Sequence, residues 1–289
     1  MSVRYKHKSL LVTGLVFIGV SAFGCYVAVD YNMMLLFFSL VGIGGSMVFP
    51  MTMTLVGGHY PQEKRSGAVG WLIAGNSLSC LVGAPLIAYL ADLGSWRTSF
   101  LTHIVPIAVL SIALVMFGFP TQRGGGLSRG SKVDYTSSFK AVFTNKSAIS
   151  CLTGSALIMA SYQAILVYSA SFYRQVFSIS RSFASMFVIG GALFFTVGSV
   201  GSAKLVNRFG RKAVTVYMGL VAGAMIAAYT IIPNLWFSAA IRFLGGLFMA
   251  LSFSALTSLT LEQMPRYRGT LMSFNSAIGY IGEALGAFI

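Results

Sequence analysis

Residues 60–67, YPQEKRSG, form a short polar stretch that recurs in diverged form at residues 264–270, MPRYRGT. A shift of 203 positions aligns Arg65 with Arg268, and the same shift aligns Gly83-Ala84 in the following apolar run with Gly286-Ala287. The Pro and Gly residues of the two stretches match this shift to within one position. A repeat of this length in a strongly hydrophobic chain predicts two homologous membrane-embedded halves, an arrangement typical of secondary transporters.

The composition supports a membrane protein and argues against a nucleic-acid partner. The chain has 289 residues, of which 56% are hydrophobic and 9% are charged, whereas soluble domains carry about 25% charged residues. The formal charge of +14 comes from short basic clusters between apolar runs, and no basic face with interleaved aromatic residues is visible. The three cysteines and three histidines lack the spacing of a metal site, so no metal and no cofactor is expected.

The apolar runs predict an all-α membrane protein with about nine transmembrane helices. A hydrocarbon core about 30 Å thick requires about 20 apolar residues per helix. The segments that meet this length are 9–29, 33–57, 67–91, 100–119, 147–172, 182–203, 213–232, 235–261 and 270–289. Residues 137–143 predict a further, short helix at the membrane interface.

The long connection at residues 120–146 divides the predicted spans into two groups. It is rich in Gly, Ser and Lys, which indicates a flexible linker. We therefore expect an N-terminal half at residues 1–119 and a C-terminal half at residues 147–289, with the linker between them.

The distribution of Lys and Arg predicts the orientation, because cytoplasmic loops of membrane proteins are enriched in these residues. The loops of one side hold 16 of the 20 basic residues, the opposite loops hold three, and Arg242 lies within a span. This asymmetry places the N-terminus and the central linker in the cytoplasm. The side with the excess holds Arg4, Lys6, Lys8, Lys64, Arg65, Arg123, Arg129, Lys132, Lys140, Lys146, Lys204, Arg208, Arg211, Lys212, Arg266 and Arg268.

Residues 203–212, AKLVNRFGRK, form the sharpest motif. A Gly permits a tight turn between two helices, and basic side chains can interact with helix ends and acidic lipid headgroups. The stretch resembles the cytoplasmic loop signature G-x-x-x-D-R-x-G-R-R of the major facilitator superfamily. The resemblance implies a conformational role for Asn207, Arg208, Gly210 and Arg211, although Ala203 replaces the first Gly and Asn207 replaces the Asp. The alternative is an ordinary basic loop.

A second resemblance involves residues 83–86, GAPL, and residues 96–100, WRTSF. They are similar to the fifth helix, and to the turn into the sixth, of drug:proton antiporters in the same superfamily, including the sugar-efflux-type branch. Gly83 and Pro85 would allow close packing and a bend in this helix. Ordinary packing of small residues is the alternative.

The resemblance to the major facilitator superfamily covers essentially the whole chain. It implies that the nine spans correspond to helices three to eleven of a twelve-helix fold, with the first two and the last absent. The chain would then be an incomplete transporter. Arg242 with Gly246 is similar to the R-x-x-x-G signature of the fourth helix, but it occurs in the second half, and Phe38 occupies the matching place in the first.

Arg242 and Glu283 are the clearest charged residues within the predicted spans, where charges are costly and usually functional. A rise of about 1.5 Å per residue places them at similar depth on consecutive antiparallel helices. We hypothesise that they pair or share a cavity, with Glu283 as a protonatable carboxylate. The alternative is that Arg242 extends toward the interface and Glu283 ends a helix.

Three further polar residues within the spans are candidates for the substrate or proton pathway: Asn76, Gln163 and Asn275. Each could line a central cavity, and each could equally form a hydrogen bond between helices.

These observations predict a secondary active transporter of the cell membrane, with a small-molecule substrate, protons and the lipid bilayer as its partners. The expected activity is proton-coupled efflux of drugs or sugars by alternating access of the two halves. Proton-coupled uptake of sugars, organic acids or other metabolites is the alternative, because a fold does not determine direction. An enzyme would need a convergent catalytic set and a channel a repeated filter segment; the sequence predicts neither.

Overall fold

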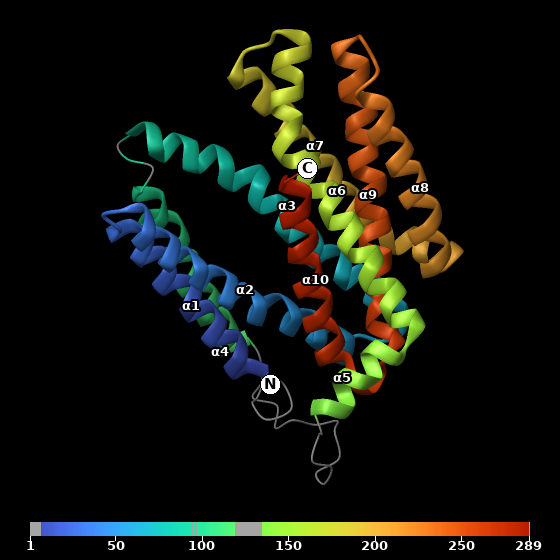
Figure 1. Ribbon diagram of the computed structural model, residues 1–289. Helices are drawn as coiled ribbons and strands as arrows, with labels where there is room; N and C mark the ends of the chain where they lie inside the picture. The colour runs from blue at the N-terminus through green and yellow to red at the C-terminus, as the bar shows by residue number, and fades with distance from the viewer. Residues whose placement is uncertain (1–6, 94, 96, 119–134, 289) are drawn as a thin grey trace. The chain divides into compact units, whose positions relative to one another are not determined.

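The computed structural model describes residues 7–93, 95, 97–118 and 135–288, and the regular elements of these residues are all helices (Figure 1). The longer helices are α1 (His7–Val27), α2 (Tyr31–His59), α3 (Gln62–Leu93), α4 (Val105–Gly118), α5 (Tyr135–Thr144), α6 (Lys146–Phe177), α7 (Arg181–Phe209), α8 (Arg211–Tyr229), α9 (Leu235–Gln263) and α10 (Arg268–Phe288). Two short elements complete the set: a π-helix, η1 (Phe100–Ile104), and a 3-10 helix, η2 (Pro265–Tyr267).

Each predicted span coincides with a helix, and the segment 100–119 is divided between η1 and α4. Eight of the described helical segments are long and apolar enough to cross a membrane. The ninth predicted span corresponds to α10, which is not among the eight. Polar residues, Asn275 and Glu283 among them, lower the mean hydropathy of this helix.

Several helix starts carry the polar caps that satisfy free backbone N–H groups. The Asn145 side chain accepts hydrogen bonds from the backbone N–H groups of Ser147 and Ala148 at the start of α6. Ser180 caps α7 and Asn234 caps α9 in the same way. The sequence therefore sets these boundaries locally.

The expected short helix at residues 137–143 is present as α5. Phe139 of α5 packs edge-on against Phe274, with 5.0 Å between the ring centroids. The location of α5 at a membrane interface stays a prediction.

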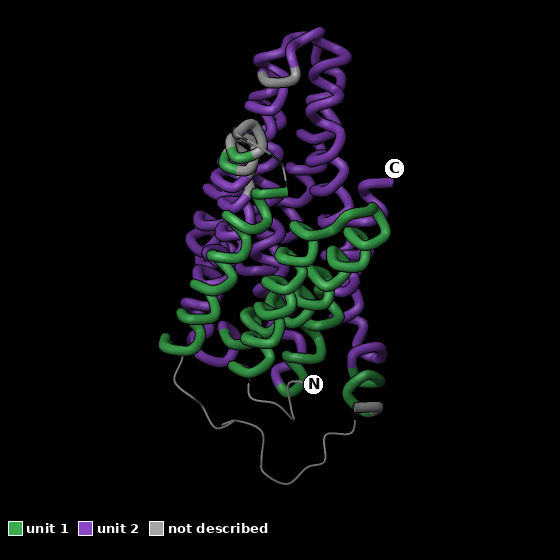
Figure 2. The backbone as a smooth tube through the Cα atoms, turned by 90° about the vertical axis from the view of Figure 1, so that its left-hand side faces the viewer, with its two compact units in different colours: residues 1–55, 84–141, 266–276 green, residues 56–83, 142–265, 277–289 purple. Residues whose placement is uncertain are grey.

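The chain divides into two compact units, each built from separate stretches (Figure 2). Unit 1 comprises residues 1–55, 84–141 and 266–276, and unit 2 comprises residues 56–83, 142–265 and 277–289. The division runs through α2, α3, α5 and α10, whereas the two halves expected from the repeat meet at the linker. The halves stay a prediction about homologous segments. The linker itself lies outside the described residues up to position 134.

In unit 1, α1 packs against α4 and η1. Leu10, Leu11 and Met51 form a buried apolar cluster there. The helices α1 and α2 approach closely at Gly14 and Gly44, where an added methyl group would meet the backbone carbonyl of the other glycine. Small residues at such crossings are typical of membrane helices.

In unit 2, α9 packs against α6, α7 and α8. The most apolar 18-residue stretch of α9 is 61% buried, a larger share than in any other candidate span. Gly198 of α7 lies against the backbone carbonyl of Leu247, and the Ser252 hydroxyl donates to the Thr215 carbonyl of α8 at 2.7 Å. The central helix α9 carries two charged residues, Arg242 and Glu262, and its packing positions both.

Candidate functional site

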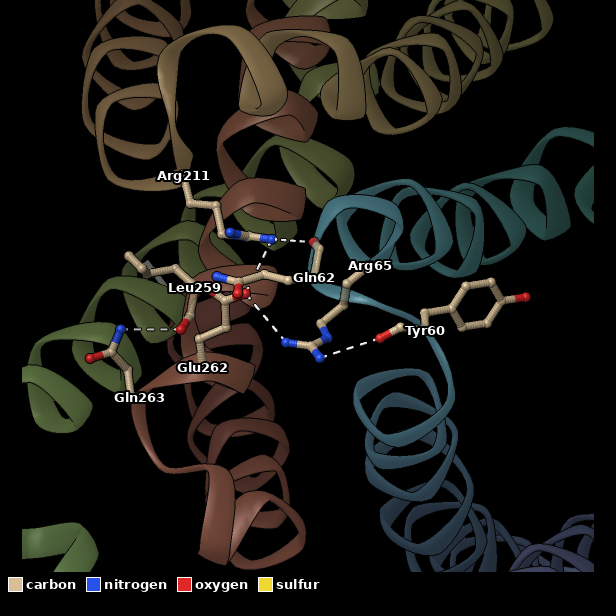
Figure 3. Close-up of polar contacts among 7 residues, drawn as sticks. All are labelled: Tyr60, Gln62, Arg65, Arg211, Leu259, Glu262 and Gln263. Carbon is tan, nitrogen blue, oxygen red and sulfur yellow. Dashed lines mark hydrogen bonds and ion pairs between the residues drawn. The ribbon is translucent and has the colours of Figure 1, made fainter.

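A cluster of charged side chains joins three helix ends of unit 2 around Glu262 (Figure 3). Glu262 lies at the C-terminal end of α9, and Arg65 and Arg211 lie in the first turns of α3 and α8. The Glu262 carboxylate is 3.3 Å from Nη1 of Arg65 and 3.1 Å from Nη2 of Arg211. One carboxylate therefore bridges two arginines, and the three side chains together carry a net charge of +1.

Both arginines also bind the backbone at the start of α3. Arg65 donates from Nη2 to the Tyr60 carbonyl at 3.3 Å, and Arg211 donates from Nη2 to the Gln62 carbonyl at 2.6 Å. The same Nη2 of Arg211 thus bridges the Glu262 carboxylate and this carbonyl. These contacts fix the N-terminal end of α3 against the end of α9.

The charged cluster is mostly shielded from solvent. The exposed fractions of the side chains are 9% for Arg65, 15% for Arg211 and 19% for Glu262. Exposed ion pairs contribute about 0–1 kcal/mol to stability, and loss of one partner of a buried pair costs about 3–5 kcal/mol. The exposure of this cluster is intermediate between these two cases. We therefore expect its loss to lower the free energy of unfolding measurably.

Glu262 is not among the site residues that the sequence predicts. Two signals were available: the chain has only six acidic residues, and Glu262 precedes a loop on the side where basic residues are in excess. The sequence did not indicate its partners, because Arg65 lies 197 positions earlier in the chain.

The residues of the loop motif are at the junction of α7 and α8. Gly210 ends α7 and has φ +81°, a conformation that favours glycine. Asn207 and Arg208 are exposed in the last turn of α7, and Arg208 lies 5.3 Å from the centroid of the Phe209 ring. Among these residues, the ion pair with Glu262 belongs to Arg211. A conformational role of the motif stays a prediction.

Arg242 is 5% exposed and lies in the N-terminal third of α9. Its Nη1 donates to the Phe187 carbonyl at 2.8 Å, and its Nη2 donates to the Ser169 hydroxyl at 3.0 Å. Its Nε is buried and has no hydrogen-bond partner among the described residues. The guanidinium lies against the backbone of Gly191, where a side chain would collide with Nη1.

The expected pair of Arg242 and Glu283 is not formed. No described carboxylate lies within ion-pair distance of Arg242, and Glu283 is half-buried on α10. The small cavity beside Arg242 is not lined by Glu283 either. The sequence placed both residues at similar depth, but the hydrogen-bond partners of Arg242 come from α6 and α7.

The cavity beside Arg242 has a volume of about 30 Å³. Its lining comes from α6, α7 and α9: Tyr162, Ile165, Leu166, Val188, Gly191, Ala192, Phe195, Arg242, Gly246 and Met249. It combines one cation with aromatic and aliphatic walls. A larger hollow of about 290 Å³ lies at the C-terminal end of α6 and involves none of the predicted site residues.

The other candidate pathway residues are dispersed. Asn76 is exposed on α3 and Gln163 is half-buried on α6, and neither lines the cavity at Arg242. Asn275 belongs to unit 1, where it is 4% exposed and its side-chain oxygen has no hydrogen-bond partner among the described residues. A pathway role for these residues stays a prediction.

The predicted helix-bend motif lies within the continuous helix α3. Gly83 is buried. The side chain of Pro85 and the whole of Trp96 lie outside the described residues. A bend at this motif stays a prediction.

Comparison with known proteins places these features in a family. The family model described as the Major Facilitator Superfamily matches residues 1–288. The chain belongs to the Major Facilitator Superfamily. It is therefore a multi-pass membrane protein, and the family resemblance inferred from residues 203–212 is confirmed.

Curated relatives match all or part of this superfamily member. The uncharacterised MFS-type transporter YceJ of Bacillus subtilis is 25% identical, and the match covers 100% of this chain and 73% of YceJ. A probable sugar efflux transporter of Pasteurella multocida is 22% identical over 100% of this chain and 70% of that protein. Multidrug resistance protein 3 of Bacillus subtilis is 31% identical over 40% of this chain and 22% of that protein.

A solved structure shares the fold. The fucose:proton symporter FucP of E. coli aligns with 98% of this chain and 76% of that chain, with a TM-score of 0.77 and 17% identity. This likeness confirms the predicted all-α major facilitator fold. The chain spans between 22% and 76% of the length of these proteins.

Proposed function

We propose that this superfamily member takes part in proton-coupled export of small organic molecules by alternating access. The observation that carries the proposal is the cluster in which Glu262 bridges Arg65 and Arg211. Arg65 belongs to the first copy of the sequence repeat, and Glu262 and Arg211 belong to the second half. A set of ion pairs between the two predicted halves, partly accessible to solvent, can close one end of a transporter and separate when that end opens.

Relatives support export as the direction. Their names include a probable sugar efflux transporter and a multidrug resistance protein. The excess of basic residues supports a cytoplasmic location for the Glu262 cluster, together with the N-terminus and the central linker. An intact cluster then corresponds to a state closed to the cytoplasm.

Proton-coupled uptake is the alternative. The structural neighbour is named a fucose:proton symporter, but at 17% identity this likeness concerns the fold. The direction of flux separates the two readings. A proton gradient, acid inside, is imposed across inside-out membrane vesicles that contain this protein. Ethidium or a labelled sugar is then added outside the vesicles.

Under export, substrate accumulates inside these vesicles, and collapse of the gradient with a protonophore abolishes the accumulation. Under symport, the same gradient drives preloaded substrate out of the vesicles. No gradient-dependent flux of any tested drug or sugar in either direction would contradict both readings.

Glu283 is the proposed protonatable group on α10, where it is half-buried. Glu283→Gln removes the titratable carboxylate and keeps a similar volume. We expect the variant to lose the dependence of flux on the proton gradient. Unchanged proton dependence would remove Glu283 from the coupling mechanism.

A further inference from the structure

The guanidinium of Arg242 is a buried cation that the described carboxylates leave without an ion pair. A charge within the membrane-spanning part of a protein is costly unless it is compensated. The two recorded partners of Arg242, the Phe187 carbonyl and the Ser169 hydroxyl, are both neutral. Their dipoles satisfy two N–H groups and leave the net charge in place.

An N–H donor of Arg242 and a small cavity beside it remain available. The Arg242 Nε is buried without a hydrogen-bond partner, and Arg242 lines a cavity of about 30 Å³. A cavity measured in this way needs about 10–15 Å³ to hold one water molecule, so this cavity has room for a small polar group such as a carboxylate. Sites for whole drug-sized molecules have about 300–1,000 Å³.

We propose that this cavity binds an anion, either a free monovalent ion or the carboxylate of an organic substrate, through the unpaired edge of Arg242. An anion supplies the negative charge that the neutral partners lack, and charge-assisted hydrogen bonds of this kind are about twice as strong as neutral ones. The aromatic walls at Tyr162 and Phe195 would contact the apolar part of such a substrate. The substrate class of the proposed exporter is then an organic monoanion, an inference that rests on the proposed function.

Glycines on two helices make the site possible. A side chain at Gly191 would collide with the guanidinium. A methyl group at Gly246 would meet the Gly191 carbonyl oxygen at 3.7 Å, which is ordinary contact. Gly246→Ala therefore narrows the cavity while Arg242 keeps its charge and its two partners.

The test uses thermal unfolding of the purified full chain in detergent. Sodium acetate is titrated against acetamide, its neutral counterpart, and ionic strength is held constant with sodium HEPES, whose anion is too large for the cavity. A ligand that binds the folded state raises Tm. We expect saturating acetate to raise Tm by about 2–4 °C, and acetamide to leave Tm unchanged.

Two variants locate the effect. Arg242→Gln removes the charge and should abolish the acetate shift, and Gly246→Ala should reduce the apparent acetate affinity at least tenfold. Equal shifts with acetate and acetamide, or a full acetate shift in folded Arg242→Gln, would overturn the proposal and show that acetate acts elsewhere on the protein. If Arg242→Gln does not fold, an unchanged acetate affinity in Gly246→Ala overturns it instead.

The same preparations separate this inference from the proposed function. Reconstituted protein that shows the acetate shift but no gradient-driven flux would contradict the transport proposal and leave the anion site intact. Protein that exports ethidium but shows no acetate shift would contradict the anion site alone. Gradient-driven export of labelled benzoate, with no export of benzamide, supports both.

Discussion

Glu262 and Arg65 form an ion pair at 3.3 Å although 197 positions separate them in the chain. Arg65 lies in the polar stretch at residues 60–67, and Glu262 lies two positions before the related stretch at residues 264–270. The ion pair therefore joins a residue within the first copy to a residue that lies just before the second copy. Arg211 from the loop motif completes the cluster.

Glu262→Gln should destabilise the protein, because two shielded arginines would lose their shared carboxylate. Between the values for exposed and buried pairs, we expect a loss of about 2 kcal/mol in the free energy of unfolding. The measurement is chemical or thermal unfolding in detergent. Glu63→Gln is the control, since Glu63 is an exposed acid in the first turn of α3 and its removal changes the charge equally. Equal effects of the two variants would contradict a specific role for Glu262.

A double-mutant cycle between Arg65→Gln and Glu262→Gln should give a coupling energy of about 1 kcal/mol, within the range for residues in direct contact. The coupling should decrease at high salt to the extent that the pair is accessible to solvent. A coupling energy near zero would mean that Tyr60 and the helix ends, and not the ion pair, hold Arg65. The same cycle with Arg211→Gln measures the second arm of the cluster.

Gly282→Ala and Gly286→Ala should each destabilise the contact between α10 and α6. A methyl group at Gly282 would collide with the Ala156 carbonyl oxygen, and one at Gly286 with that of Ala160. Because backbone atoms cannot move aside cheaply, we expect a loss of about 1–3 kcal/mol for each variant. Thermal unfolding or protease resistance in detergent provides the measurement.

Gly279→Ala is the matched control on α10. Its added methyl group would meet a side-chain carbon of Met159 at 3.6 Å, an ordinary contact. We expect it to be neutral or slightly stabilising, since alanine favours helix over glycine by about 1 kcal/mol. A loss of stability as large as that of Gly282→Ala would show that the helix contact is not the cause.

Gly70→Ala should separate α3 from α7. A methyl group at Gly70 would collide with the Ser199 carbonyl oxygen, whereas one at Gly75 of the same helix would meet nothing within 4 Å. A hydrogen bond between Ser77 and Thr196 at 2.8 Å holds the same two helices. We expect Gly70→Ala, and not Gly75→Ala, to lower Tm, by about 2–6 °C for a loss of 1–2 kcal/mol. Equal Tm values for both variants would contradict this packing.

The sequence alone determined the helices and the family. Runs of about 20 apolar residues allow few other structures in a bilayer, because every backbone polar group must be paired within the segment. The helices α1 to α4 and α6 to α10 lie where these runs predict. Gly210 has the positive φ that a tight turn requires, and the family signature around it was identified correctly.

The tertiary structure decided the partners of the charges. The similar depth of Arg242 and Glu283 on consecutive helices led to the hypothesis that they pair or share a cavity. Depth along a helix does not fix the direction in which a side chain points. Helix rotation and packing instead direct Arg242 to Ser169 and the Phe187 carbonyl. Glu262 gained its role in the same way, because close packing brought three helix ends together around a residue that its local sequence did not distinguish.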